Sequence, residues 1–244
     1  MSDRPASPRG TQARQGNREP VAAADRSRSW ALQIGISIGL VVVAVVAVLV
    51  VAAMSSDGGE DGGPVTASDE RLVRPDSQRL TEPTAPVATF VEFLDPECEA
   101  CRAAAPAVEQ LVETYGDRVT FVVRYFPLHT NSMAAARAAE AAAAQGRLSE
   151  MLARLFETQP EWGENRTSQR DFFFALAEGL GLDMTQFEQT FDDPATTERI
   201  ERDLADARSL GLTGTPTFFL DGEQLQPGSA AELVRTVEDG VSSS

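Results

Sequence analysis

The chain has 244 residues with 37 acidic and 21 basic side chains, one histidine and two cysteines, and its formal net charge is −16 at pH 7. A surface this acidic repels the phosphate backbone of nucleic acids, so binding to nucleic acid is not expected. Two cysteines also exclude a secreted domain that is held together by a scaffold of disulfides. The length fits one large domain or two small ones.

Residues 31–53 form an apolar stretch without a charged side chain. As a helix it measures about 34 Å, enough to cross the ~30 Å hydrocarbon core of a bilayer. Six arginines precede it and no basic residue follows it before Arg71, so the positive-inside rule predicts a cytoplasmic N-terminus. We therefore expect a disordered cytoplasmic tail at 1–29, a single-pass membrane anchor at 30–54 and a flexible linker at 55–84.

A cleaved signal peptide is the alternative interpretation of this apolar stretch. Val51-Ala52-Ala53 has the small residues of a cleavage site, but the apolar core of a signal peptide spans about 7–15 residues. The greater length favours an uncleaved anchor in the cell membrane. In that case the C-terminal part of the chain is extracytoplasmic.

An α/β domain is predicted over residues 85–240, and it begins with a strand, a helix and a second strand. Segments 87–94 and 118–128 are rich in β-branched and aromatic residues, and the alanine-rich segment 99–115 between them favours a helix. This succession predicts a right-handed βαβ unit with parallel strands.

The second part of this domain is predicted to contain mostly helices. Helical patterns interrupted by glycine and proline fill an insertion over about residues 131–211. Residues 215–226 then predict a β-hairpin that turns at Asp221-Gly222, and residues 229–240 predict an amphipathic helix. The predicted order is βαβ, a helical insertion, and ββα.

Both cysteines lie in the segment FVEFLDPECEAC, residues 90–101. A zinc site needs four ligands, whereas Cys98 and Cys101 have one histidine, His129, as a further soft ligand, and acids would have to complete the site. A structural disulfide between residues three apart closes too small a loop to restrict the unfolded chain much. Both interpretations are therefore less favoured than a redox pair.

The residues before the cysteines favour redox chemistry. Asp95 is a plausible N-cap with Pro96 at the first helical position, which places Cys98 in the first turn. Free backbone N–H groups there stabilise a thiolate. Cys101 lies one turn deeper, so we expect an exposed nucleophile and a shielded resolving thiol.

The C-x-x-C motif after a βα turn, "FPL" at 126–128 and the helical insertion together resemble the DsbA-like branch of the thioredoxin superfamily. The resemblance covers about residues 85–240. It implies a thioredoxin fold with a helical insertion between the βαβ and ββα halves, here preceded by one transmembrane helix. It also implies a thiol–disulfide oxidoreductase that uses neither a cofactor nor a metal.

The resemblance assigns roles to further residues. Glu92, six residues before Cys98, is the implied proton acceptor for Cys101, and its alternative is a solvent-facing strand glutamate. Thr215 and Pro216 correspond to the cis-proline loop that docks an extended substrate, and their alternative is a trans proline that opens an edge strand. Pro106 corresponds to the proline that kinks the active-site helix. His129 is interpreted as a loop or packing residue.

The direction of electron flow stays open at this stage. Glu97 and Glu99 flank Cys98, and a negative charge ~7 Å away raises the free energy of a thiolate by roughly 0.6–2.4 kcal/mol. The helix N-terminus offsets about 0.3–2 kcal/mol of this, so the effects nearly cancel. The preferred function is forming or shuffling disulfides in exported proteins. Alternatives are an extracytoplasmic reductase, for example in cytochrome maturation, and a non-catalytic binding or chaperone module.

The preferred function implies two kinds of partner. The first is the substrate, an exported protein whose cysteines are reduced or wrongly paired. The second is a redox partner in the membrane that reoxidises, or reduces, Cys98 and Cys101.

Overall fold

The computed structural model describes residues 69–243. The predicted tail at 1–29, the anchor at 30–54 and the linker up to residue 68 lie outside the described residues. Within the described part of the chain, no helix combines the length and apolar character needed to cross a membrane.

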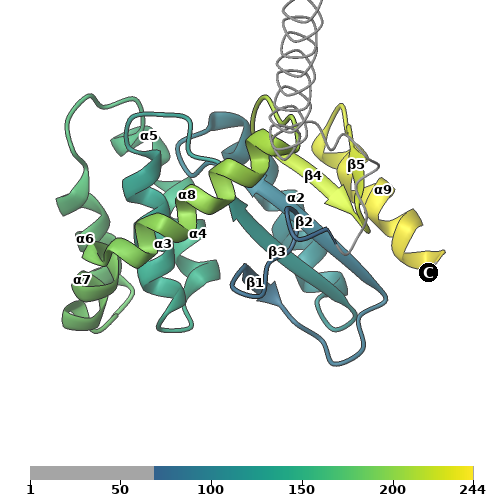
Figure 1. Ribbon diagram of the computed structural model, residues 1–244, viewed down its shortest axis with the longest axis horizontal. Helices are drawn as coiled ribbons and strands as arrows, with labels where there is room; N and C mark the ends of the chain where they lie inside the picture. Colours follow the sequence, from purple (N-terminus) through teal and green to yellow (C-terminus); the bar gives the residue numbers. More distant parts are fainter. Residues whose placement is uncertain (1–68, 244) are drawn as a thin grey trace, which may run out of the picture. The chain divides into compact units, whose positions relative to one another are not determined.

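Five strands form one sheet in the order β1-β3-β2-β4-β5 (Figure 1). They are β1 (Gln78–Thr81), β2 (Ala88–Leu94), β3 (Val119–Tyr125), β4 (Thr217–Leu220) and β5 (Glu223–Leu225). β2 and β3 are parallel, whereas β1 pairs antiparallel with β3, and β4 pairs antiparallel with β2 and β5. The predicted βαβ unit and the predicted hairpin are both confirmed.

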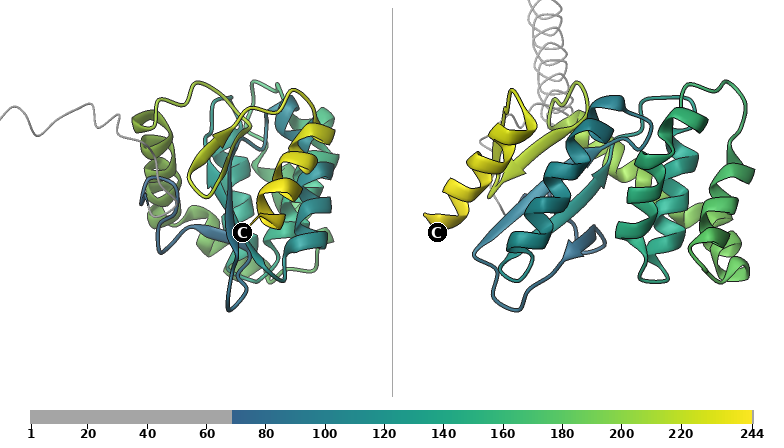
Figure 2. Two further views of the ribbon diagram at one scale, coloured as in Figure 1. Left: turned by 90° about the vertical axis from the view of Figure 1, so that its right-hand side faces the viewer. Right: turned by 180° about the vertical axis from the view of Figure 1, so that it is seen from behind.

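Different helices cover the two faces of the sheet (Figure 2). These helices are α2 (Glu99–Tyr115), α8 (Pro194–Ser209) and α9 (Ala230–Ser242). Phe90 packs with Leu111 of α2 and Leu233 of α9, whereas the next residue, Val91, belongs to the opposite core with Ala207 of α8. Successive strand residues point to opposite faces of a sheet, so β2 is buried on both sides. This explains why its sequence is almost continuously apolar.

The predicted helical insertion is confirmed between β3 and β4, to one side of the sheet (Figure 1). Besides α8 it contains α3 (Ser132–Ala143), α4 (Leu148–Glu157), α5 (Gln159–Trp162), α6 (Arg170–Gly179) and α7 (Met184–Asp192). Its core includes Trp162 and Phe173, whose ring centroids lie 5.0 Å apart in an edge-to-face arrangement. The buried alanines of α3 allow its neighbouring helices to approach closely.

The folded domain begins earlier than the predicted residue 85. Leu72 is fully buried, and β1 adds a strand to the sheet beside β3. Arg74 donates two hydrogen bonds to Asp206 of α8, at 2.5 and 2.7 Å. The prediction of a linker up to 84 is therefore wrong for residues 69–84, because contacts with distant residues order a segment whose local composition resembles that of a tether.

Candidate active site

The two cysteines lie where β2 passes into α2. β2 ends at Leu94, and a turn follows in which the Cys98 N–H donates to the Asp95 carbonyl at 3.0 Å. Cys98 is itself the N-cap residue of α2, and Glu99 is the first helical residue. The prediction that Asp95 caps the helix is wrong, because its carboxylate accepts hydrogen bonds from the backbone N–H groups of Glu97 and Leu128 instead.

The two thiols differ in accessibility. Cys98 is partly exposed, whereas Cys101 is fully buried, and both are free thiols in this structure. The Asp95 N–H lies 3.5 Å from the Cys101 Sγ. The pair therefore offers one sulfur that another protein can reach and one that the fold encloses.

The acidities of the two thiols also differ. A hydrogen bond from the Cys101 thiol and the backbone N–H groups of Cys101 and Ala100 lower the pKa of Cys98 to about 5, although partial burial opposes this shift. Burial, followed by Cys98 and Glu92, raises the pKa of Cys101 far above its usual value. At neutral pH the reduced site therefore holds a thiolate at Cys98 and a thiol at Cys101.

The two glutamates that flank Cys98 in the sequence differ in burial and in hydrogen bonding. Glu97 is buried, and its carboxylate accepts hydrogen bonds from the Asn131 N–H at 2.6 Å, the Ser132 hydroxyl at 3.3 Å and the Glu164 N–H at 2.9 Å. Glu99 is exposed to solvent. The expected near-cancellation at Cys98 is therefore wrong, since hydrogen bonds to its sulfur lower its pKa despite partial burial.

Glu92 lies in the middle of β2 and is buried, so it is not the solvent-facing glutamate of the alternative interpretation. Burial, and then the charge of Cys98, raises its pKa to about 8. The residue lines a cleft of about 210 Å³, whose other walls are mostly apolar side chains of α2 and α4. A carboxyl group with this pKa can both donate and accept a proton near neutrality.

The loop before β4 faces Cys98. The Thr215–Pro216 peptide bond is cis, as predicted. When it is protonated, the Cys98 thiol donates to the Thr215 carbonyl, with 3.3 Å between sulfur and oxygen. Residues far apart in the sequence thus form one site around the accessible sulfur.

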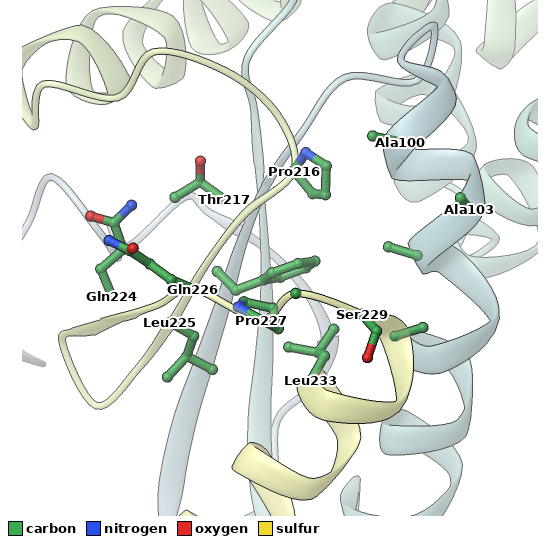
Figure 3. Close-up of a pocket in the computed structure, with 14 residues that line it drawn as sticks. Ala100, Ala103, Pro216, Thr217, Gln224, Leu225, Gln226, Pro227, Ser229 and Leu233 are labelled. Carbon is green, nitrogen blue, oxygen red and sulfur yellow. The ribbon is translucent and has the colours of Figure 1, made fainter.

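A cleft of about 550 Å³ adjoins this loop (Figure 3). Its walls come from α2, the cis-proline loop, β5 and the start of α9, and the labelled residues include Ala100, Ala103, Pro216, Gln224 and Leu233. Sequence reasoning missed the contribution of β5 and α9. The only signal was the short polar segment between the hairpin and the last helix.

The structure also places the remaining candidates. Pro106 lies inside α2 on its exposed side. His129, interpreted from the sequence as a loop or packing residue, has its Nδ1 2.7 Å from an oxygen of the Asp95 carboxylate. Among residues 69–243, no group of three or more His, Cys, Asp or Glu side chains is arranged to hold a metal ion.

The domain is similar to a known protein family and to several solved structures. Residues 75–239 match the protein-family model described as Thioredoxin. A thioredoxin-like oxidoreductase from Silicibacter pomeroyi DSS-3 is 28% identical, with a TM-score of 0.59 over 71% of this chain and 96% of that chain. BdbD from Bacillus subtilis is 20% identical, with a TM-score of 0.61 over 75% of this chain and all of that chain. Wolbachia pipientis α-DsbA1 is also 20% identical, with a TM-score of 0.61 over 70% of this chain and 94% of that chain.

The curated relatives are much longer proteins. A Na⁺/H⁺ antiporter NhaA from Herminiimonas arsenicoxydans is 37% identical over 168 residues, which cover 69% of this chain and 26% of that protein. An antiporter of the same name from Mycobacterium sp. strain KMS is 37% identical over 186 residues, or 72% of this chain and 29% of that protein. The chain thus spans less than a third of the length of these relatives.

Proposed function

Because the chain belongs to the thioredoxin superfamily and has the architecture of its DsbA-like thiol–disulfide oxidoreductases, we propose that it forms disulfides in exported proteins, outside the membrane to which it is tethered. The apolar stretch 31–53 supports the tether. The relatives named as Na⁺/H⁺ antiporters also support a membrane setting, since an antiporter carries ions across a membrane.

The low pKa of Cys98 is the observation that favours oxidation of substrate thiols over reduction of substrate disulfides. A thiolate that is stable at neutral pH stabilises the reduced enzyme, so its disulfide readily accepts electrons from a substrate. Cys98 has a pKa of about 5, and hydrogen bonds from Cys101 and the start of α2 account for this value. The same property disfavours the reductase alternative, which needs a couple that gives electrons away.

The reaction starts from the oxidised enzyme, in which Cys98 and Cys101 form a disulfide. A substrate thiolate attacks the Cys98 Sγ, the bond between the two cysteines breaks, and Cys101 leaves as a thiolate. Because the pKa of Cys101 is so high, this sulfur takes up a proton. Glu92, with a pKa of about 8, is protonated near neutrality and supplies it.

The second step releases the product. The other thiolate of the substrate attacks the substrate sulfur of the mixed disulfide, and Cys98 leaves as a thiolate. The substrate has lost two electrons and the protons of its two thiols, and the enzyme has gained the two electrons. A redox partner in the membrane removes these electrons, and Glu92 accepts the Cys101 proton on the way back.

Substrate docking uses the loop that faces Cys98. The Thr215 backbone lies beside the reactive sulfur, and an extended peptide can pair with it in the manner of an added strand. The adjoining cleft of about 550 Å³ combines apolar side chains with the Gln224 amide. This mixture suits unfolded segments of varied sequence, as an enzyme for many exported proteins requires.

The test is a stoichiometric oxidation assay. The oxidised protein is mixed with a reduced, unfolded protein that contains two cysteines, and the free thiols are counted over time. We expect Cys98→Ala and Cys101→Ala each to abolish oxidation, because neither variant can form the enzyme disulfide. Mixed instead with the disulfide form of the same test protein, Cys101→Ala should accumulate a mixed disulfide at Cys98, as its thiolate attacks that disulfide and releases one substrate thiol. Glu99→Gln, which changes an exposed neighbour of Cys98, serves as the matched control and should retain activity. Oxidation by Cys98→Ala would overturn the proposal.

A further inference from the structure

The loop after β3 carries a histidine that the disulfide exchange described above does not use. Leu94 and Tyr125 are partners in the parallel pair β2–β3, and the Phe126 N–H donates to the Leu94 carbonyl at 2.8 Å. The two strands therefore end at the same edge of the sheet, which brings Asp95 and His129 together. The His129 Nδ1 lies 2.7 Å from the Asp95 Oδ2, and the His129 N–H donates to the Ser132 hydroxyl.

Asp95 places a negative charge inside the protein next to the active site. Its side chain is fully buried, and the N–H groups of Glu97 and Leu128 each donate to its carboxylate at 2.8 Å. Its carbonyl accepts the Cys98 N–H, and its own N–H lies against the Cys101 sulfur. Without a counter-charge, this carboxylate opposes a thiolate at Cys98.

His129 is placed to supply that counter-charge. Its side chain is about half exposed (48%), so protons exchange freely with solvent. Partial burial lowers the pKa of His129, but the hydrogen bond to Asp95 and the negative charges of Asp95, Cys98 and Glu97 outweigh this and raise it above its ordinary value. The neighbouring segments contribute neutral groups to this cluster, namely the hydroxyl of Ser132 and the backbone N–H groups of Asn131 and Glu164.

We propose that His129 is the counter-charge of Asp95 and a positioning residue for the Cys98 thiolate. While the imidazole is protonated, it cancels the buried carboxylate and the thiolate is stabilised. When the imidazole loses its proton, the charge of Asp95 acts on Cys98 and the reduced form loses stability. The inference rests on the proposed function to the extent that it gives the oxidase a contribution to its oxidising strength that is lost as His129 loses its proton.

The test replaces the charge but keeps the hydrogen bond. In His129→Asn the side-chain amide can donate to Asp95, yet it carries no charge. We measure the absorbance of the reduced protein's thiolate and its redox equilibrium with glutathione, both at about pH 6 and about pH 9. At the lower pH the variant should shift the glutathione equilibrium about three- to tenfold toward the disulfide. At the higher pH, where His129 is neutral, variant and parent should coincide.

Two further variants sharpen the result. His129→Lys stays charged at both pH values, so its glutathione equilibrium should match the parent's at the lower pH and lie further toward the reduced form than the parent's at the higher pH. Arg102→Gln removes an exposed cation from the same helix as Cys101 and serves as the matched control, with a change of less than about twofold. An unchanged equilibrium in His129→Asn at low pH would overturn the proposal, and so would a shift of equal size at both pH values, which indicates a packing role.

These measurements separate this inference from the proposed function. Thiolate absorbance and the glutathione equilibrium require no protein substrate, so they test His129 even if oxidation of exported proteins fails. Conversely, the oxidation assay with Cys98→Ala does not depend on the charge of His129.

Discussion

Two regions of this protein contain buried carboxyl groups. In one region they are paired with arginine, and in the other the carboxyl group lies among apolar side chains. Between β3 and α8, Asp203 and Asp206 surround the guanidinium of Arg124, and Glu140 binds the guanidinium of Arg199 at 2.5 Å. Within β2, Glu92 is enclosed mainly by apolar walls. The carboxylates paired with arginine hold elements together, whereas the carboxyl group of Glu92, left among apolar side chains, has a pKa of about 8 that chemistry can use.

The paired region fastens the start of the domain to the sheet. Arg124 is fully buried and donates to the carbonyls of Arg71 and Leu72, at 3.0 and 2.7 Å, as well as to the two aspartates of α8. One side chain of β3 thus connects the first described residues with the last helix of the insertion. The network contributes to folding at a place where no reacting group is present.

The largest expected effect concerns the pH dependence of stability through Glu92. Its pKa is about 8 in the folded protein and 4.5 as a model value. Because the folded-state pKa is raised, its stability contribution is complete below about pH 4.5 and is lost as pH rises through 8. The loss amounts to about 5 kcal/mol. Glu92→Gln should therefore be more stable than the parent at about pH 9 by up to that amount, and similar to it at about pH 4, in urea unfolding of the reduced proteins.

The charge of Cys98 is part of the reason why the pKa of Glu92 is raised, so this repulsion is included in the expected difference. Glu109→Gln, an exposed change on α2 with the same loss of charge, is the matched control and should shift stability little at either pH. Equal stabilities of Glu92→Gln and its parent across this pH range would show that Glu92 is hydrated, and the contrast between the two regions would fail.

The next largest effect concerns Arg124. Arg124→Met removes the cation but keeps the length of the side chain, which leaves the buried Asp203 and Asp206 without it. Breaking a buried pair in this way destabilises a protein by about 3–5 kcal/mol. Chemical unfolding at neutral pH should show this loss, while the absorbance of the Cys98 thiolate should keep its pH midpoint. A shifted midpoint would mean that the two regions are coupled, contrary to the separation drawn above.

Most of the fold follows from local patterns in the sequence. The helix predicted at 99–115 coincides with α2, and α4 lies within the predicted helical insertion, because each has an apolar face that repeats with the helical period. The early start of the domain could not be predicted in this way. Segment 78–81 is short and lies among linker-like residues, and its strand forms through pairing with β3, about 40 residues further along the chain.

The site residues that belong to a sequence motif could be predicted. Those whose role depends on tertiary contacts could not. Cys98, Cys101 and the Thr215–Pro216 loop are recognisable from their sequence context. The burial of Glu97 depends on partners in the insertion, and the role inferred for His129 depends on its contact with Asp95 across two strand ends. A charge count along the sequence treated Glu97 as a free acid beside Cys98, which is why the direction of electron flow remained undecided.

The smallest expected effect tests whether burial, and not pairing alone, gives the network its strength. Arg202 binds Asp76 at 2.5 Å, at the same end of the domain, but both side chains are about half exposed (46% and 48%). Solvent screens such a pair, so Arg202→Met should cost less than about 1 kcal/mol in the unfolding experiment used for Arg124→Met. Added salt should reduce even this difference, because exposed charges are screened further. If both methionine variants lose equal stability, the number of ion pairs rather than their burial determines how firmly α8 and the start of the domain are joined.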